Sequence, residues 1–136
     1  MRKERRTVLL VDDDVDFLAI GERALNAVGF SVLTASGRDE AMARLEAEMP
    51  DVIVSDLMMG SLDEGFAFAR ELKSDTRYAS IPVVIVTSVS RAMGFDFTPR
   101  SDADLSAMGA DAFLEKPVTP STLARTVADL AAAARW

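Results

Sequence analysis

The sequence predicts an α/β domain in which a parallel sheet of five strands is covered by helices on both faces. Strand-like apolar runs alternate with segments in which apolar residues recur at helical spacing, which gives five β-α units. Runs such as residues 83–86 are continuously apolar, as strands buried on both faces are. The length of 136 residues and the 49% hydrophobic content suit one globular domain.

The first β-α unit and the second strand follow directly from these patterns. Residues 8–11 form the first strand. Small or apolar residues at helical spacing between positions 17 and 28 form the first helix, and Gly29 is well placed to end it. Residues 30–35 are predicted to be a short second strand.

A second helix and a third strand come next. Ser36, with Asp39 three residues on, resembles a weak capping box at the start of a helix. This helix is predicted to continue through Met49, because Pro50 terminates it. Residues 51–55 form the third strand.

The second half contains the less regular part of the chain. A glycine-containing loop, residues 60–65, leads into a helix, and Pro82 starts the fourth strand, where a missing N–H is tolerated. Residues 88–108 fit no regular pattern and predict an irregular fourth helix region. After the fifth strand, Thr119-Pro120 opens a last helix. The helices at both ends of this half present apolar residues inward: Phe66, Ala69 and Leu72 in one, and Leu123, Val127 and Leu130 in the other.

Composition narrows the classes of function. A net charge of −7 argues against sequence-independent nucleic-acid binding, so no direct nucleic-acid partner is expected. No apolar run approaches the ~20 residues that cross a membrane, and export is not indicated, so a cytoplasmic location without a membrane partner is expected. The chain has neither cysteine nor histidine, so any metal should be a hard, oxygen-bound ion such as Mg²⁺.

Polar residues suited to phosphate or metal chemistry stand where four of the predicted strands end. Asp12 and Asp13 follow the first strand, Asp56 the third, Thr87 the fourth and Lys116 the fifth. If these strands are parallel neighbours, all these residues lie along the carboxyl edge of the sheet, where ligands bind in open α/β folds. Three carboxylates, a hydroxyl and an ammonium group indicate a site for a divalent cation and a phosphoryl group.

Each of these side chains suits a role in phosphoryl transfer. The crowded carboxylates of Asp12 and Asp13 are stabilised by a cation, and Asp13 could share Mg²⁺ with Asp56. A carboxylate is a competent nucleophile toward phosphorus, so Asp56 could accept a phosphoryl group as an acyl phosphate. Lys116 would neutralise charge on the transferring oxygens, and Thr87 would donate its hydroxyl to the third oxygen.

These residues resemble the motifs of the receiver domains of two-component response regulators, over nearly the whole chain. Val11-Asp12-Asp13 looks like the acidic pair of that family, and residues 56–59 look like its phosphoacceptor segment. Residues 86–88 resemble its threonine followed by a small residue, and residues 109–117 its closing lysine-proline motif. The resemblance implies a flavodoxin-like (βα)5 fold with strand order 2-1-3-4-5 and a site between strands one and three.

The resemblance also implies the chemistry of the site. Asp56 would accept a phosphoryl group from a phosphohistidine on a partner sensor histidine kinase or histidine phosphotransfer protein. Asp13, Asp56 and the backbone carbonyl of Met58 would hold Mg²⁺, with Asp12 acting partly through water. Lys116 and Thr87 would assist the transfer, and the protein would catalyse only its own phosphorylation and dephosphorylation.

Such a protein passes on its signal by changing the conformation of a surface that another protein binds. Thr87 and Phe113 would be the switch residues, and phosphorylation would alter the surface formed by residues 88–116, which an unknown downstream protein reads. We expect residues 1–136 to be a single receiver domain without an effector domain, present as a monomer or weak dimer. The sequence departs from the family at Gly60, where proline is usual, and at Phe113, which lacks a tyrosine hydroxyl.

Two alternatives come from other classes of protein. A haloacid-dehalogenase-like phosphatase would use Asp12 as nucleophile and Asp14 as acid. Against it, Asp16 stands where that class has Thr or Val, no acidic pair follows Lys116, and Asp56 would have no role. A receiver-like interaction module that is never phosphorylated would lack one residue of the site, and none is missing. Labelling by a small phosphodonor with Mg²⁺ separates the three.

Overall fold

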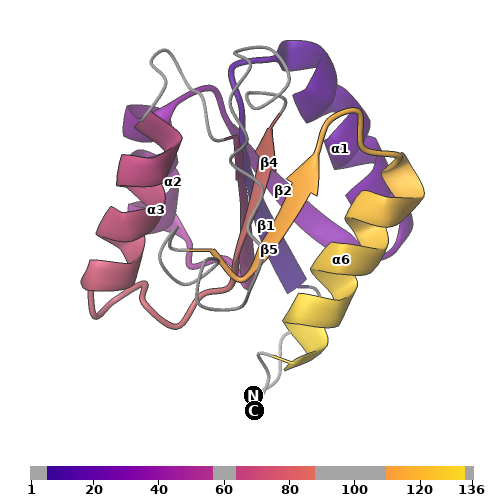
Figure 1. Cartoon of the computed structure of the whole chain (residues 1–136). Coiled ribbons are helices and arrows are strands. Elements are labelled where there is room, and N and C mark those ends of the chain that lie inside the picture. Colours follow the sequence, from indigo (N-terminus) through magenta and orange to yellow (C-terminus); the bar gives the residue numbers. More distant parts are fainter. Residues whose placement is uncertain (1–5, 57–63, 88–109, 134–136) are drawn as a thin grey trace.

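In the computed structural model, which describes residues 6–56, 64–87 and 110–133, a parallel sheet lies between two layers of helices (Figure 1). Its strands are β1 (Arg6–Val11), β2 (Phe30–Ala35), β3 (Val52–Asp56), β4 (Val83–Thr87) and β5 (Ala112–Glu115). The helices of the described ranges are α1 (Val15–Ala27), α2 (Arg38–Ala47), α3 (Glu64–Ser74) and α6 (Pro120–Ala133). The five strands lie in the order β2-β1-β3-β4-β5, which confirms the predicted fold and strand order.

The register of the strands brings the polar residues at their ends to one edge of the sheet. Val11 lies opposite Ser55, so Asp12 and Asp56 are at the same level on adjacent strands. On the far side of β3, Thr87 lies opposite Glu115, and Lys116 follows. All pairings are parallel, so these ends meet at the carboxyl edge, as predicted.

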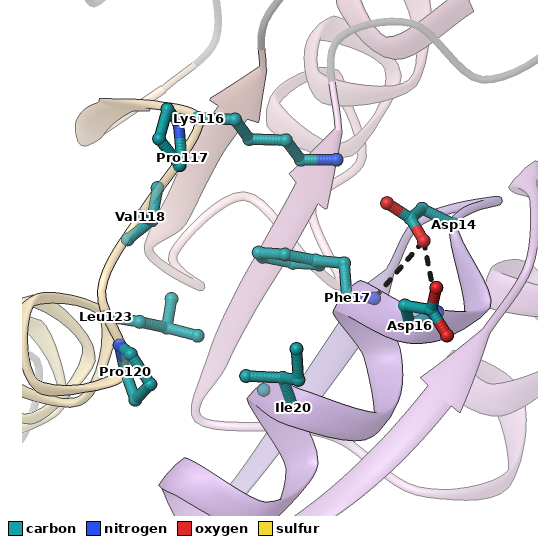
Figure 2. A pocket seen from close by; sticks show the side chains of 10 residues that line it. Asp14, Asp16, Phe17, Ile20, Lys116, Pro117, Val118, Pro120 and Leu123 are labelled. Atoms are coloured by element: carbon teal, nitrogen blue, oxygen red, sulfur yellow. Dashed lines mark hydrogen bonds between the residues drawn. The ribbon is translucent and has the colours of Figure 1, made fainter.

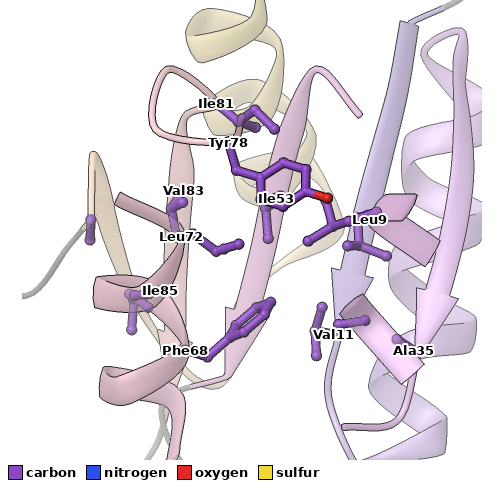
Figure 3. Packing of buried hydrophobic residues seen from close by; sticks show 14 residues of the cluster. Leu9, Val11, Ala35, Ile53, Phe68, Leu72, Tyr78, Ile81, Val83 and Ile85 are labelled. Atoms are coloured by element: carbon purple, nitrogen blue, oxygen red, sulfur yellow. The ribbon is translucent and has the colours of Figure 1, made fainter. Parts of the chain in front are cut away.

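Alternate residues of the central strands pack into two separate cores, one on each face of the sheet. Helices α2 and α3 cover one face, and α1 and α6 cover the other (Figure 1). The first core takes Leu9, Val11, Ile53, Val83 and Ile85 from the strands (Figure 3). The second takes Val8, Leu10, Val52, Val54, Val84 and Val86. Both sets are buried, which explains why these strands are continuously apolar.

The ends of α1 follow from local chemistry. The side chain of Asp14 accepts hydrogen bonds from the backbone N–H groups of Asp16 and Phe17, at 3.0 and 3.3 Å, and so caps the helix. At the other end Gly29 adopts a φ of 98°, and its N–H donates to the carbonyl of Asn26 at 3.1 Å. This left-handed residue ends the helix where the sequence predicted it.

The start of α2 differs from the predicted capping box. The backbone N–H and the hydroxyl of Ser36 both donate to Oε1 of Glu40, at 2.6 and 3.0 Å. The carboxylate that closes the box is therefore Glu40 rather than Asp39. The helix begins at Arg38, and its N-cap residue is Gly37. Glycine has no side chain, so no side-chain hydrogen bond caps this helix at the N-cap position.

The end of α2 also differs, because the helix stops at Ala47 and not at Met49. Glu48 is already extended, with φ −153° and ψ 129°. Its carboxylate accepts a hydrogen bond from the hydroxyl of Thr7 at 2.9 Å, a contact with β1 that a longer helix would lose. Pro50 adds to this by disfavouring a helical conformation at Met49.

The third helix begins at Glu64, two residues earlier than the predicted loop of residues 60–65 allows, and the residues predicted to face inward are confirmed where the structure describes them. Ala69 and Leu72 of α3 are buried, as are Leu123 and Val127 of α6, while Leu130 is half-buried against the same core. The hydroxyl of Thr119 accepts from the N–H of Thr122 at 3.2 Å and caps α6. The predicted irregular region at residues 88–108 lies outside the described residues. Among the helices that are described, none is long and apolar enough to cross a membrane.

Candidate functional site

Three carboxylates from two adjacent strands meet at the carboxyl edge of the sheet. Asp12 and Asp13 follow β1, and Asp56 is the last residue of β3. One oxygen from each lies within 4.8 Å of the others. Asp12 is fully buried, Asp56 is 8% exposed and Asp13 is exposed. Clustered carboxylate oxygens are the ligands that hard divalent cations prefer, so this donor set fits Mg²⁺.

Lys116 brings the only positive charge described at this cluster, from the end of β5. Its Nζ donates a hydrogen bond to Oδ2 of Asp12 at 2.8 Å and lies 3.5 Å from Oδ2 of Asp56. The side chain of Lys116 is 18% exposed. The ammonium group therefore stands between the two buried carboxylates as a partly desolvated point charge, the arrangement that stabilises charge on a transferring phosphoryl group.

The buried charges shift each other's ionisation. Burial raises the pKa of Asp12 from 3.8 to about 6, and the charge of Asp56 adds to this. The hydrogen bonds from Lys116 and from the backbone N–H of Asp14 work in the opposite direction. For Lys116, burial lowers the pKa, but the hydrogen bond to Asp12 and the charges of Asp56, Asp12 and Asp14 together outweigh burial, so the net shift of the pKa is upward. Lys116 is thus held in its charged form.

A largely apolar groove of about 470 Å³ opens beside this cluster, between α1 and the segment that joins β5 to α6. Asp14, Asp16 and Ile20 line the side formed by α1, and Lys116 lies on the opposite side. Figure 2 shows the ring of Phe17 extending across the groove toward Lys116. The centroid of that ring is 4.6 Å from Nζ of Lys116.

The structure brings together most of the predicted site residues that it describes. Asp12, Asp13, Asp56 and Lys116 form one cluster, whereas Met58 lies outside the described residues. Thr87 is the last residue of β4, two strands from Asp12, so its backbone is at the expected edge. Phe113 is half-buried and packs against the core under α2 and α3.

Sequence reasoning missed Phe17 as a residue of the site. Its spacing with Leu18 and Gly21 indicated a core position on the first helix, and it does pack against the core between α1 and α6. The contact with Lys116 depends on how close the start of α1 lies to the residue that follows β5, which no local pattern reports. An aromatic residue in the first turn after an acidic strand end was the one available signal.

The chain matches the response regulator receiver domain over residues 8–128 and belongs to that family. It is 35% identical over 127 residues to the response regulator Rre1 of Synechocystis, covering 93% of this chain and 52% of that protein. It is 32% identical over 123 residues to a probable transcriptional regulator, ycf27, of Guillardia theta, covering 88% of this chain and 42% of that protein. The chain thus spans about half the length of these curated relatives.

Solved structures agree with this assignment. The chemotaxis response regulator CheY4 of Vibrio cholerae superposes with a TM-score of 0.77 at 28% identity, over 93% of this chain and 98% of that one. A receiver domain of a signal transduction histidine kinase from Syntrophus aciditrophicus gives 0.77 at 29% identity, over 94% and 91%. Receiver domains are phosphoacceptors in two-component signalling, phosphorylated by histidine kinases, and do not act as enzymes on a separate substrate. Family membership therefore argues against the haloacid-dehalogenase alternative.

Proposed function

We propose that Asp56 is the phosphoacceptor of a two-component phosphorelay and that the donor is a phosphohistidine on a sensor histidine kinase or histidine phosphotransfer protein. A carboxylate oxygen of Asp56 attacks the phosphorus, the bond from phosphorus to the imidazole nitrogen breaks, and an acyl phosphate results. Within this proposal, residues 1–136 act as one receiver domain.

One observation carries the choice of Asp56 among the three carboxylates. Asp56 is buried but keeps an accessible surface of 8%, and it lies 3.5 Å from the ammonium of Lys116. Asp12 has no accessible surface and is already hydrogen-bonded to Lys116 at 2.8 Å, so a donor cannot reach it. Asp13 is exposed, which suits a ligand to a hydrated cation better than a nucleophile in a site that excludes water.

The cluster of Asp12, Asp13 and Asp56 is typical of the Mg²⁺ site of receiver domains. In our proposal Asp13, Asp56 and the backbone carbonyl of Met58 hold the ion, with Asp12 acting partly through water. The bound ion would neutralise charge on the phosphoryl oxygens. Lys116 supplies a second positive charge, 3.5 Å from Asp56, and the hydroxyl of Thr87 is assigned to the remaining oxygen.

The groove beside the site supports a protein as the donor. Val15 and Ile20 of α1 are 70% and 55% exposed, and Ile20 lines the groove next to the carboxylates. Exposed apolar side chains next to a reactive group favour contact with another protein. A small phosphodonor needs no such surface, so the two kinds of donor can be distinguished by altering α1.

Phosphorylation is proposed to act through Thr87 and Phe113 on the surface formed by residues 88–116. Thr87 ends β4, and Phe113 lies on the neighbouring strand β5, opposite Ile85. A shift of Thr87 toward the phosphoryl oxygens would therefore also move the segment that follows Thr87 and the neighbouring strand β5. Of this surface, residues 88–109 lie outside the described residues.

The experiment that tests the function is intact-mass analysis after treatment with acetyl phosphate and Mg²⁺. One phosphoryl group should be added to the wild type and lost in Asp56→Asn. Asp39→Asn, which alters a fully exposed side chain of α2, is the matched control and should be labelled as the wild type is. Full labelling of Asp56→Asn would refute the assignment of Asp56 as the phosphoacceptor. Labelling of Asp12 would instead favour the haloacid-dehalogenase-like phosphatase. A wild type that takes up no phosphoryl group would favour the interaction module.

A further inference from the structure

We infer that Phe17 is a positioning residue for Lys116: the face of its ring holds the ammonium group between Asp12 and Asp56, where it meets the transferring phosphoryl group. This inference rests on the proposed phosphoryl transfer to Asp56. It adds to that proposal a residue of α1 that is neither a nucleophile nor a metal ligand.

The contacts of Lys116 suggest this role. Nζ lies 4.6 Å from the centroid of the Phe17 ring, within the ~6 Å over which an aromatic face attracts a cation. The same atom lies 2.8 Å from Asp12 and 3.5 Å from Asp56. An ammonium group has three N–H donors and prefers water where protein oxygens are missing. The ring faces it with an apolar surface that attracts a cation and displaces that water.

Lys116 needs such support because its side chain is long and other acceptors are near. A lysine side chain loses considerable rotamer freedom when it is held in one place. The groove that contains Lys116 is also lined by the carboxylates of Asp14 and Asp16. Figure 2 shows the ring of Phe17 alongside the side chain of Lys116, with the carboxylate of Asp14 beyond the end of that side chain. A smaller side chain at this position would let the ammonium move away from Asp56.

The position of Phe17 is itself well determined. Its backbone N–H donates to the capping carboxylate of Asp14 at 3.3 Å, in the first turn of α1. Its side chain packs against the core between α1 and α6, from the same helix as buried Gly21 and Leu25. The ring is thus held by the helix start on one side and by the core on the other, and it can restrain a flexible lysine.

The simpler explanation is that Phe17 only covers the core. Three variants separate the two. Phe17→Leu keeps an apolar side chain and removes the aromatic face, and Phe17→Trp restores an aromatic face. Leu18→Ala is the matched control, because Leu18 packs against the same core from the next position and its loss leaves the ring in place.

Two measurements are made on each variant. The first is the NMR shift of the ε-methylene protons of Lys116, which a ring face above the ammonium group moves upfield. We expect this upfield shift in the wild type, in Phe17→Trp and in Leu18→Ala, and its loss in Phe17→Leu. The second is the rate of phosphorylation by acetyl phosphate with Mg²⁺. Phe17→Leu should lower that rate by about 3- to 30-fold, the range implied by a cation–π contact between exposed and desolvated sites. Phe17→Trp should restore most of it.

A double-mutant cycle gives the decisive comparison. In a Lys116→Met background, Phe17→Leu should cause no further loss of rate, because the residue that it positions is gone. An equal loss in both backgrounds, or a wild-type rate in Phe17→Leu, would overturn the inference. So would a wild type without the upfield shift. A wild type that is never phosphorylated would instead refute the proposed function, and the NMR shift would still decide whether the ring holds Lys116.

Discussion

Removal of the charge of Asp12 is expected to stabilise the folded chain when Mg²⁺ is absent. Asp12 has no accessible surface, and burial is the main cause that raises its pKa from 3.8 to about 6. A difference of about 2 pKa units, at about 1.4 kcal/mol per unit, corresponds to about 3 kcal/mol of folding free energy. An asparagine side chain in place of Asp12 would resemble the protonated carboxyl, so Asp12→Asn should recover up to about 3 kcal/mol at neutral pH.

The sign of the pH dependence follows from the direction of this shift. Because the pKa of Asp12 is raised on folding, the folded chain holds this proton more tightly than the unfolded chain does. The stability associated with the proton is complete below the unfolded pKa and is lost as the pH rises through the folded value. The advantage of Asp12→Asn should therefore grow from about 1 kcal/mol near pH 4.5 to about 3 kcal/mol near pH 7.5.

Urea unfolding followed by circular dichroism, in a chelating buffer at several pH values, measures this difference. Asp13→Asn is the control: Asp13 is exposed, so its charge stays hydrated and the change should be within about 1 kcal/mol. Saturating Mg²⁺ should reduce the advantage of Asp12→Asn, because a ligand of the folded state adds to the stability of the wild type. An advantage that does not depend on pH, or a variant less stable than the wild type near pH 7.5, would show that burial of this charge has been misjudged.

Three further predictions concern the metal, the packing of α1 and the donor. Asp13→Ala should weaken Mg²⁺ binding by at least about tenfold in calorimetry, because few protein ligands hold this ion, and wild-type affinity would remove Asp13 from the ligand set. Gly21→Ala should lower the free energy of unfolding by about 1–2 kcal/mol, since a Cβ there would lie 2.7 Å from buried Leu10 Cδ2, and this overlap outweighs the ~1 kcal/mol that alanine gains over glycine inside a helix. Gly37→Ala, whose Cβ meets nothing within 4 Å, should cost less than about 1 kcal/mol, through the weaker N-cap of α2 alone. Equal effects of the two in urea unfolding would refute the tight packing of α1 on the sheet. Ile20→Asp should slow phosphorylation by a phosphohistidine protein and leave the rate with acetyl phosphate unchanged; equal slowing would exclude the groove as the donor's contact.

The sequence by itself was enough to predict the elements and the edge at which the site lies. Continuous apolar runs marked β1, β3 and β4, and the polar residue at the end of each run marked a common edge. This works because the carboxyl ends of parallel strands meet on one side of a sheet, whatever the order of the strands. The order itself came from the resemblance of the motifs to a family, since periodicity does not report which strands pair.

Helix ends were predicted less well, because they depend on contacts across the fold. At the start of α2, Ser36 had two acidic residues within reach, and the geometry selected Glu40 over Asp39. At its end, Glu48 left the helix for the hydroxyl of Thr7, a partner 41 residues away in sequence. Helix propensities of neighbouring residues differ by only a few tenths of a kcal/mol, so they do not determine where a helix ends. A single hydrogen bond to another part of the fold is then enough to determine it.

Only the tertiary structure decided how the site residues differ from one another. Asp12 and Asp13 are adjacent in the sequence, yet one is fully buried and the other is exposed. Lys116 reaches Asp12 across 104 residues of chain, and Phe17 meets Lys116 only because α1 and the end of β5 converge. The alternation of apolar and polar residues determines which elements form. The depth of a carboxylate and the partner of an ammonium group depend on distances between elements, which packing alone sets.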